Sequence, residues 1–267
     1  MKKRICLLAA LGITIWALAG CNMGYEYEDA DLYTPGDGSA DPALVRSIEV
    51  DWPLGSVTVN PFDGDQLEFS DNSPFPSEEN LLHSYLDGDT LKMQFCKSDF
   101  WGRAAREPKD LEVLIPRAFM ENIQEISIDT ESAAVFLNDV QTGDLEIHTK
   151  SGGVTVDGAA MQTVVETESG DIALSGAFEA VETESRSGTL TIICTGCPRQ
   201  FTGESSSGDF QITLPADSNF SLEYTLGRGA LISDFAGQES DGVYRVGEGS
   251  CNLSLETKKG NLYLWKQ

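Results

Sequence analysis

Cysteine is the residue type in this sequence best suited to covalent or metal chemistry. Four cysteines lie beyond residue 21: Cys96, Cys194, Cys197 and Cys251. Four thiols can pair in three ways. Cys194 and Cys197 have the Cys-x-x-Cys spacing of redox and metal motifs, but they lie between strand-like repeats, where no helix dipole would lower a thiol pKa. A zinc site would need Cys96 and Cys251 at the same place. We therefore expect a local Cys194–Cys197 disulfide, with other pairings or free thiols as alternatives.

Acidic side chains recur at regular intervals in the same region. Five glutamates fall at matching positions of successive repeats: Glu166, Glu168, Glu182, Glu184 and Glu204. In stacked strands they would lie about 4.8 Å apart as ladders of like charge, offset by solvent, by Lys150 or Arg186, or by a cation. This favours a solvated acidic face, with weak Ca²⁺ binding as the sharper alternative. The sequence has neither an EF-hand loop nor a Gly-Gly-x-Gly-x-Asp nonapeptide, so we expect no dedicated metal site and no cofactor.

The sequence offers little to an enzyme. Its two histidines, His83 and His148, leave little for histidine-based catalysis, and it lacks a nucleophile elbow, a phosphate loop and a His-Glu-x-x-His motif. A polysaccharide-acting enzyme with paired carboxylates is the catalytic alternative. With 43 acidic residues, however, a suitable pair arises by chance, and short repeats leave little room for a cleft. We expect a non-catalytic protein.

The net charge restricts the partners. The 267 residues include 43 acidic and 18 basic side chains, which gives a formal charge of −25. Such a chain repels phosphate backbones, so a nucleic-acid partner is not expected.

The first residues have the order of a bacterial lipoprotein signal peptide. A basic start, Lys2 to Arg4, precedes an apolar run, residues 5–18, that is too short for a comfortable membrane span. The run ends in Leu18-Ala19-Gly20-Cys21, which resembles a lipobox. The resemblance implies that residues 1–20 are removed and that lipidated Cys21 anchors the exported chain to the outer face of the cell membrane, or to an outer membrane. Removal of three basic residues changes the formal charge to −28.

Residues 21–46 are expected to form an acidic linker. The segment is rich in Gly and Pro and has no periodicity. Repulsion between its carboxylates would extend it and hold the following domain away from the membrane.

The remaining residues, 47–267, repeat a strand–turn–strand unit. The clearest copies begin at Ile147, Val165, Val181 and Phe201, and weaker copies begin at Ile48, Ile128, Leu222 and Leu255. From 128 to 222 the starts lie 19, 18, 16, 20 and 21 residues apart. Each copy alternates with period two and contains a glycine turn, as in Val165-Glu-Thr-Glu-Ser-Gly170.

No single unit can bury its apolar face, so neighbouring units must stack. We expect one all-β domain, a β-solenoid similar to a parallel β-helix, built of stacked 16–21-residue repeats. Inward threonine and serine hydroxyls would bond to one another or to carbonyls along the stack. The hexapeptide helix fails because Asp171 and Ala177 occupy its positions after Val165. An antiparallel sandwich stays open as a competitor. The stacked units predict one interior column: Ile147, Val165, Val181 and Phe201.

Residues 61–108 depart from the repeat, and we expect them to form an N-terminal capping region over the first coil. Residues 66–70 and 90–96 look like strands, and residues 78–86 like a short helix. The aromatic loop at residues 100–103 offers an alternative interpretation as a contact site.

The succession of these features resembles a known family. It comprises the lipobox, Gly55 in an opening strand pair, the stretch Leu111-Glu-Val-Leu-Ile-Pro116, the Thr-x-Ser-Gly repeats, Leu214-Pro215 and a closing Leu255-Glu-Thr-Lys-Lys-Gly260. It is similar to the "putative adhesin" family, a bacterial β-strand-repeat domain of unknown function, over about residues 47–265. The resemblance implies a β-helical scaffold at the cell envelope and carries no catalytic residues.

Together these features predict an envelope lipoprotein that acts as a surface adhesion or interaction scaffold. Its partners would be the membrane, through Cys21, and an envelope protein or a wall polymer. An envelope-stress accessory or sensor that binds a membrane partner, and the polysaccharide-acting enzyme, are the alternatives.

Overall fold

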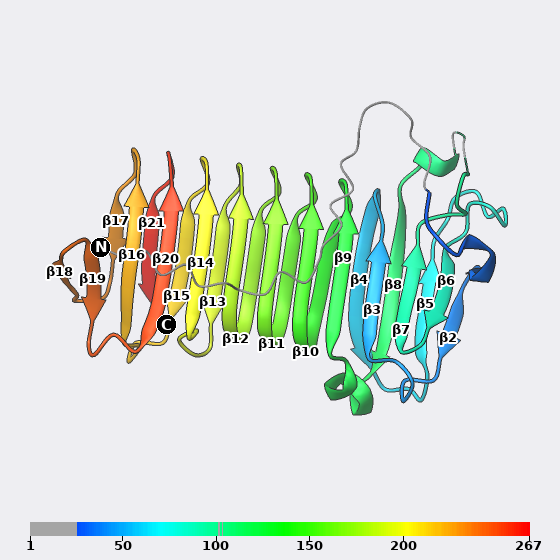
Figure 1. The fold of residues 1–267 in the computed structure, drawn as a ribbon, viewed down its shortest axis with the longest axis horizontal. Coiled ribbons are helices and arrows are strands. Elements are labelled where there is room, and N and C mark those ends of the chain that lie inside the picture. Colours follow the sequence, from blue (N-terminus) through cyan, green and yellow to red (C-terminus); the bar gives the residue numbers. More distant parts are fainter. Residues whose placement is uncertain (1–25, 101, 103) are drawn as a thin grey trace, which may run out of the picture.

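The chain folds into one elongated stack of β-strands. The computed structural model describes residues 26–100, 102 and 104–267, so the predicted signal peptide, residues 1–20, and Cys21 lie outside them. Regular structure in this part is β, apart from short 3-10 helices at Ala30–Leu32, Ala104–Arg106 and Arg117–Asn122. The strands cross the long axis and succeed one another along it (Figure 1). The predicted all-β solenoid is confirmed.

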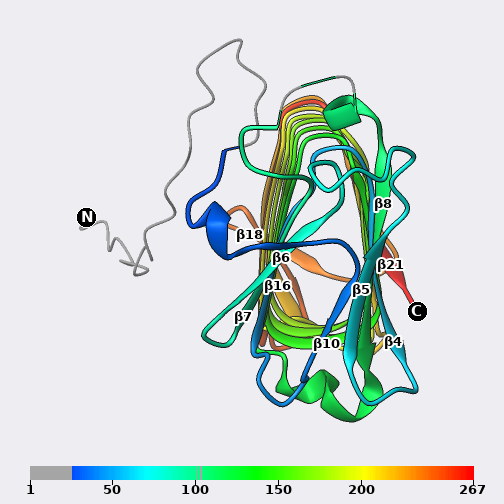
Figure 2. The same cartoon turned by 90° about the vertical axis from the view of Figure 1, so that its right-hand side faces the viewer.

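Two walls of strands face each other, and each coil contributes to both (Figure 2). Three long strands bend from one wall into the other: β10 (Ala134–Thr149), β11 (Val154–Thr167) and β12 (Ile172–Ser185). We name the walls for the side chains that they present to solvent. The acidic wall contains β7 (Thr90–Gln94), β3 (Ser47–Asp51), β9 (Glu125–Thr130), the second parts of β10, β11 and β12, β14 (Gln200–Ser205), β20 (Cys251–Thr257) and β16 (Phe220–Leu226). The neutral wall contains β8 (Lys109–Pro116), β4 (Gly55–Phe62), the first parts of β10, β11 and β12, β13 (Leu190–Cys194), β15 (Phe210–Leu214), β21 (Leu262–Lys266) and β17 (Leu231–Ser233).

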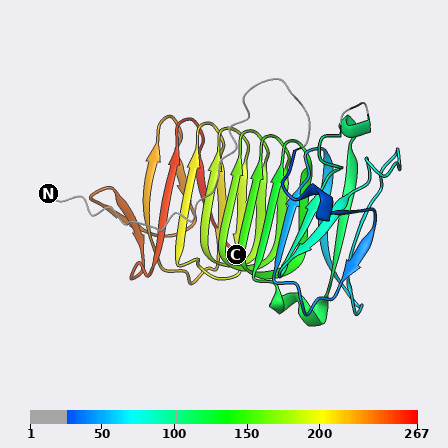
Figure 3. The same cartoon turned by 45° about the vertical axis from the view of Figure 1, so that its right-hand side comes forward.

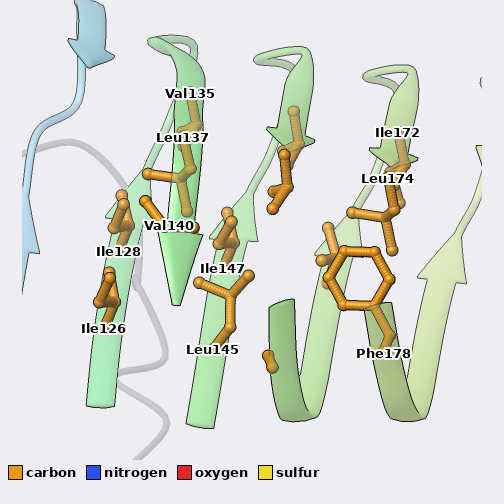
Figure 4. Packing of buried hydrophobic residues seen from close by; sticks show 14 of the residues in the cluster. Ile126, Ile128, Val135, Leu137, Val140, Leu145, Ile147, Ile172, Leu174 and Phe178 are labelled. Carbon is orange, nitrogen blue, oxygen red and sulfur yellow. The ribbon is translucent and has the colours of Figure 1, made fainter. Parts of the chain in front are cut away.

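Apolar side chains from the two walls fill the space between them. Leu145 and Ile147 point inward from the acidic wall, and Val135 and Leu137 from the neutral wall, with at most 2% of each exposed (Figure 4). Phe178 is also buried, at the bend between the two parts of β12. The inward and outward side chains alternate with period two, as predicted.

The register differs from the prediction by two residues at one coil. Val165 pairs with Thr183, not with Val181. The copy that begins at Val181 has two more residues before its turn glycine, Gly188, than the copy before it, and the coils align at these turns. The Thr183 hydroxyl is consequently buried with no hydrogen-bond partner among the described residues. The prediction of one interior column is therefore wrong. That column was expected to contain Ile147, Val165, Val181 and Phe201.

Glycines stacked at one turn bring successive coils into close contact. A Cβ atom at Gly170 would overlap the Gly152 carbonyl oxygen in the adjacent coil, and one at Gly208 would overlap the Gly188 carbonyl oxygen. The same overlap recurs along the glycine column, in stacking order: Gly152, Gly170, Gly188, Gly208, Gly260 and Gly229. No side chain larger than hydrogen fits at these positions without movement of the backbone.

Inward hydroxyls hold most of these turns. The Gly170 N–H donates to Thr167 Oγ1 at 2.8 Å, and the Gly152 N–H to Thr149 Oγ1 at 2.9 Å. Ser205 and Thr257 accept in the same way from the glycines three residues after them. Of the two predicted kinds of partner, a carbonyl along the stack is found at Thr257, whose hydroxyl donates to the Gly208 carbonyl of the adjacent coil at 3.2 Å. At the other turns the hydroxyl accepts from its own glycine N–H, whereas the Ser185 hydroxyl has no partner among the described residues.

The coils do not stack in chain order at either end. The last coil, β20 and β21, lies between the β14–β15 coil and the β16–β17 coil, where its red strands separate yellow from orange (Figure 3). At the other end, β3 and β4 lie between β7–β8 and β9–β10. A hairpin of β18 (Gln238–Ser240) and β19 (Val243–Val246) pairs with the outermost strand, β16. A simple succession of repeats therefore holds only in the middle of the stack.

The predicted N-terminal capping region is present and includes part of the predicted linker. β5 (Leu67–Asp71) and β6 (His83–Asp87) pair antiparallel with β8 and β7. β1 (Thr34–Pro35) and β2 (Gly38–Ala40) then pair with β6 and β5. The linker expected over residues 21–46 is wrong for its described part, from residue 26. The prediction relied on the acidic composition of the segment and overlooked its tyrosines. The Tyr33 ring packs against two others, with centroids 4.7 Å from Tyr27 and 5.5 Å from Tyr85.

The helix expected over residues 78–86 is also wrong. Residues from His83 onward form β6, because they reach β7 through a tight turn in which Gly88 has a φ of 64°.

A buried lysine fixes the capping region to the first coils. The Lys109 ammonium forms an ion pair with Asp71 and donates to the Asn80 carbonyl at 2.6 Å. It also lies 4.9 Å from the ring centroid of Trp52 and 4.6 Å from that of Phe95. Burial lowers the pKa of Lys109, and the hydrogen bond to Asp71 opposes this effect. The ion pair therefore joins β5 to β8 in the dry interior of the cap.

Among the residues that the structure describes, no helix has the length and apolar character needed to cross a membrane.

The glycine column can be tested by substitution. Gly170→Ala places a methyl group against the Gly152 carbonyl and should reduce the free energy of unfolding by about 2–3 kcal/mol. Thermal unfolding followed by circular dichroism should show a melting temperature about 5–10 °C lower. Gly196→Ala is the matched control, because a Cβ there meets nothing within 4 Å. Equal stability of the two variants would contradict the close approach.

Candidate interaction surface

One outward column of the acidic wall carries a carboxylate on nearly every coil. Backbone pairing places these residues next to one another in the order Asp51, Asp129, His148, Glu166, Glu184, Glu204 and Glu256. We call this set the acidic column. Neighbouring strands lie about 4.8 Å apart, so like charges are held side by side along the wall.

The acidic column contains three of the five glutamates predicted for it. Glu166, Glu184 and Glu204 are paired in sequence. Glu182 is directed outward from a different position, between Val164 and Thr202, because of the two-residue shift in register. Glu168 lies in the turn beyond Thr167.

Comparison of the repeats within the sequence did not assign Glu256 to the acidic face. Glu256 pairs with Glu204 although the two residues are 52 positions apart. The signal that could have found it is the Thr-Lys-Lys-Gly turn that follows, since Thr257 and Gly260 reproduce the turn bond of the middle coils.

The basic side chains near the acidic column form ion pairs with carboxylates of the neighbouring turns. Lys150 Nζ lies 2.7 Å from Glu131, and Arg186 lies 3.6 Å from Glu168. Both pairs are exposed, so each contributes little to stability. Within the acidic column, His148 is the basic side chain, and the column continues beyond it as Glu166, Glu184, Glu204 and Glu256.

His148 bridges two carboxylates. Its Nε2 lies 2.8 Å from Glu146, and its Nδ1 lies 3.1 Å from Glu166. Burial lowers the pKa of His148, but the hydrogen bond to Glu146 and the charges of Glu166 and Asp129 outweigh it, so the pKa is raised overall. These contacts favour the charged imidazolium form.

The N-terminal end of the acidic column binds protons more tightly than ordinary carboxylates do. Burial, followed by the charges of Asp129, Glu131 and Glu49, raises the pKa of Asp51 to about 7. Burial also raises the pKa of Asp129. The charge of this end therefore changes near neutral pH.

The other end of the acidic column opens into a shallow hollow of about 390 Å³. The β18–β19 hairpin forms one side of it, with Asp241, and the sheet forms the floor, with Glu204, Glu223 and Glu256. Across residues 26–100, 102 and 104–267, however, no three His, Cys, Asp or Glu side chains converge as metal ligands do. The predicted cation-binding ladder thus lacks a convergent site, because a flat wall holds its side chains parallel.

The neutral wall contrasts with this surface. Between β10 and β17, its outward residues are mostly uncharged: Phe136, Thr155, Ala173, Ser175, Thr191, Ile193, Gln211, Thr213, Ile232, Tyr263 and Trp265. Asp157 is charged, as are Asp139, exposed where β10 bends, and Lys266, exposed at the end of β21. The Tyr263 and Trp265 rings stack with centroids 5.6 Å apart. Charge is therefore concentrated on one side of the solenoid.

The structure does not form the predicted Cys194–Cys197 disulfide. All four described cysteines are free thiols. Cys194 ends β13 with its side chain fully buried, because the alternation of that strand directs it inward. Cys197 lies in the following return and contacts Cys251 instead. Cys96 is buried in the capping region, and burial raises its pKa to about 12.

The raised pKa of Asp51 predicts a pH-dependent gain in stability on its removal. The native carboxyl group holds its proton up to about pH 7, whereas in the unfolded chain it ionises near pH 4, so the native state loses stability between these values. Asp51→Asn should therefore stabilise the protein little at pH 4 and by about 1–2 kcal/mol at pH 8. Melting temperatures measured from pH 4 to pH 8 should differ from wild type by about 3–6 °C at the upper end. Glu125→Gln, on the exposed start of β9, is the control. A gain for Asp51→Asn that does not grow with pH would contradict the assignment.

Comparison with solved structures finds distant similarity. A "putative adhesin" from Bacteroides fragilis is 13% identical, with 86% of this chain and 96% of that chain covered and a TM-score of 0.47. A "putative lipid binding protein" from Parabacteroides distasonis is 12% identical, with coverage of 86% and 96% and a TM-score of 0.42. A "putative cell adhesion protein" from Clostridium sporogenes is 9% identical, with coverage of 88% and 100% and a TM-score of 0.39. Similarity at this level transfers no function.

The comparison with curated proteins found no match. The family model described as Toastrack DUF4097 matches residues 118–264, which run from the 3-10 helix at Arg117–Asn122 to β21 and include the middle coils and the interleaved last coil. This match confirms the resemblance to an adhesin-like family of unknown function, and the chain belongs to the Toastrack DUF4097 family.

Proposed function

We propose that this protein is an exported, lipid-anchored interaction scaffold that binds a basic partner along its acidic wall. The observation that carries the proposal is the acidic column, in which Glu166, Glu184, Glu204 and Glu256 succeed one another on four adjacent strands. A cationic chain laid across these strands would meet a carboxylate at each coil. Several weak ion pairs formed together give multivalent binding.

The opposite wall supports a directional surface. Because the neutral wall carries little charge between β10 and β17, the field of this part of the solenoid is stronger on the acidic side and would steer a cationic partner there. The partner would be a basic segment of an envelope protein or a cationic wall polymer. The predicted anchor at Cys21 would confine the binding to the cell envelope.

Binding to a defined cationic probe tests the acidic column. Fluorescence anisotropy of a labelled ten-residue oligolysine should report binding to the full chain in detergent at 20 mM salt and its loss at 300 mM. Replacement of Glu166, Glu184, Glu204 and Glu256 by Gln should weaken binding about tenfold or more.

The control removes the same charge from the capping end of the chain, by Glu26→Gln, Glu28→Gln, Asp31→Asn and Glu68→Gln. The net charge of the two quadruple variants is equal, so net charge alone predicts equal losses. Equal losses would therefore contradict a localised surface. Turnover of a glycan that stops on a single carboxylate substitution would support the enzymatic alternative instead.

The anchor is tested separately at Cys21. Wild-type protein expressed in a bacterial host should sediment with membranes and carry an acylated N-terminal peptide in mass spectrometry. Cys21→Ala removes the thiol that accepts the lipid, so the acylated peptide should disappear. An acylated peptide that persists in Cys21→Ala, or one absent from the wild-type protein, would contradict the anchor.

A further inference from the structure

Two cysteines that are far apart in the sequence meet where the last coil enters the stack. Cys197 lies in the return between β13 and β14, and Cys251 is the first residue of β20. The Cys251 thiol donates to the Cys197 carbonyl with an Sγ to O distance of 3.6 Å. The two thiols are also within hydrogen-bonding reach of each other. Both side chains are half-buried against the hydrophobic core.

Backbone hydrogen bonds on both sides fix the position of Cys251. Its N–H donates to the Asn219 carbonyl at 3.2 Å, and the next N–H, of Asn252, donates to the Arg199 carbonyl at 3.0 Å. Cys251 is thus held between the β16 coil and the β14 coil. Arg199, which accepts the second of these bonds, lies two residues after Cys197. The fold presents the two thiols to each other without rearrangement of the strands.

Neither of the other described cysteines competes for this pair. Cys194 is fully buried at the end of β13. Cys96 is buried just after β7, which lies at the opposite end of the stack (Figure 1). The structure therefore favours one bond, between residues 54 positions apart, and leaves Cys96 and Cys194 as free thiols.

We propose that Cys197 and Cys251 form a disulfide that fastens the interleaved last coil into the stack. The bond would close a loop that contains β14 to β19, and it would hold β20 between β14 and β16. The inference rests on the proposed export, because an oxidising compartment is where such a bond persists.

The bond forms by thiol–disulfide exchange with a disulfide oxidant, such as oxidised glutathione or a disulfide oxidoreductase. One cysteine, as thiolate, attacks the oxidant, which releases one thiolate and leaves a mixed disulfide. The second cysteine then attacks the protein sulfur of that mixed disulfide and releases the other thiolate. The two cysteines lose two protons and two electrons, and the oxidant is reduced to two thiols. Burial raises the pKa of Cys197, so the exchange is expected before the last coil is fully packed.

The test uses the full chain, refolded in a glutathione redox buffer. Free thiols are trapped by alkylation, and the protein is digested without reduction and mapped by mass spectrometry. We expect a linked peptide pair that contains Cys197 and Cys251. Reduction should lower the melting temperature by about 5–10 °C.

Variants separate this bond from the alternatives. Cys194→Ser should retain both the linked pair and the shift on reduction, whereas Cys197→Ala and Cys251→Ala should each lose both. The double variant Cys197→Ala with Cys251→Ala keeps the test valid if a single unpaired thiol impairs folding, because its melting temperature should not respond to reductant. A Cys194–Cys197 peptide, or alkylation of Cys197 and Cys251 in the oxidising buffer, would overturn the proposal.

The outcome is independent of the proposed binding function. If the wild-type chain binds oligolysine but shows no disulfide in the oxidising buffer, the disulfide proposal alone is refuted. A disulfide in a chain that does not bind oligolysine would refute the acidic surface alone.

Discussion

The close contact of backbone at the glycine column is the constraint on which the rest of the structure depends. At each of these turns the glycine of one coil lies against a carbonyl oxygen of the neighbouring coil, and a Cβ atom at that glycine would overlap the oxygen. The turns therefore fix the register, and the strands between them adapt. Where the Val181 copy carries two additional residues, they enter the strand and displace its side chains by one inward position. The buried Thr183 hydroxyl is the energetic cost of keeping the glycine in place.

The sequence predicts the solenoid and its cap well, because the period-two alternation and the turn glycines are local signals. It fails where the answer depends on which copy lies next to which. Repeats aligned by their Val-Glu-Thr-Glu strands put Glu182 in the same column as Glu166, whereas the glycines put Glu184 there. The position of β20 between β14 and β16 leaves no local signal, since any of these strands could pair with any other. The contribution of Tyr27 and Tyr33 to the cap was hidden by the acidic residues around them.

Register and surface chemistry are thus linked. The same alignment that buries Thr183 brings Glu184 beside Glu166 and Glu204, and the interleaved last coil adds Glu256 to them. The acidic column is consequently built from both the regular middle of the stack and its rearranged end. Its two ends differ in chemistry, with a raised carboxyl pKa at Asp51 and an open hollow beneath the β18–β19 hairpin.

Interleaving at both ends also decides how such a protein can change in size. The first and last coils are each held between two others, so insertion or loss of a unit there would disturb three layers at once. The middle coils pair with their neighbours in nearly the same register, so a unit of 18 residues could be duplicated or deleted between β10 and β12 while both closures stay intact. Each duplication would lengthen the molecule by one strand spacing, about 4.8 Å. Relatives of different length are then expected to vary in the number of middle coils, while the two ends keep their architecture.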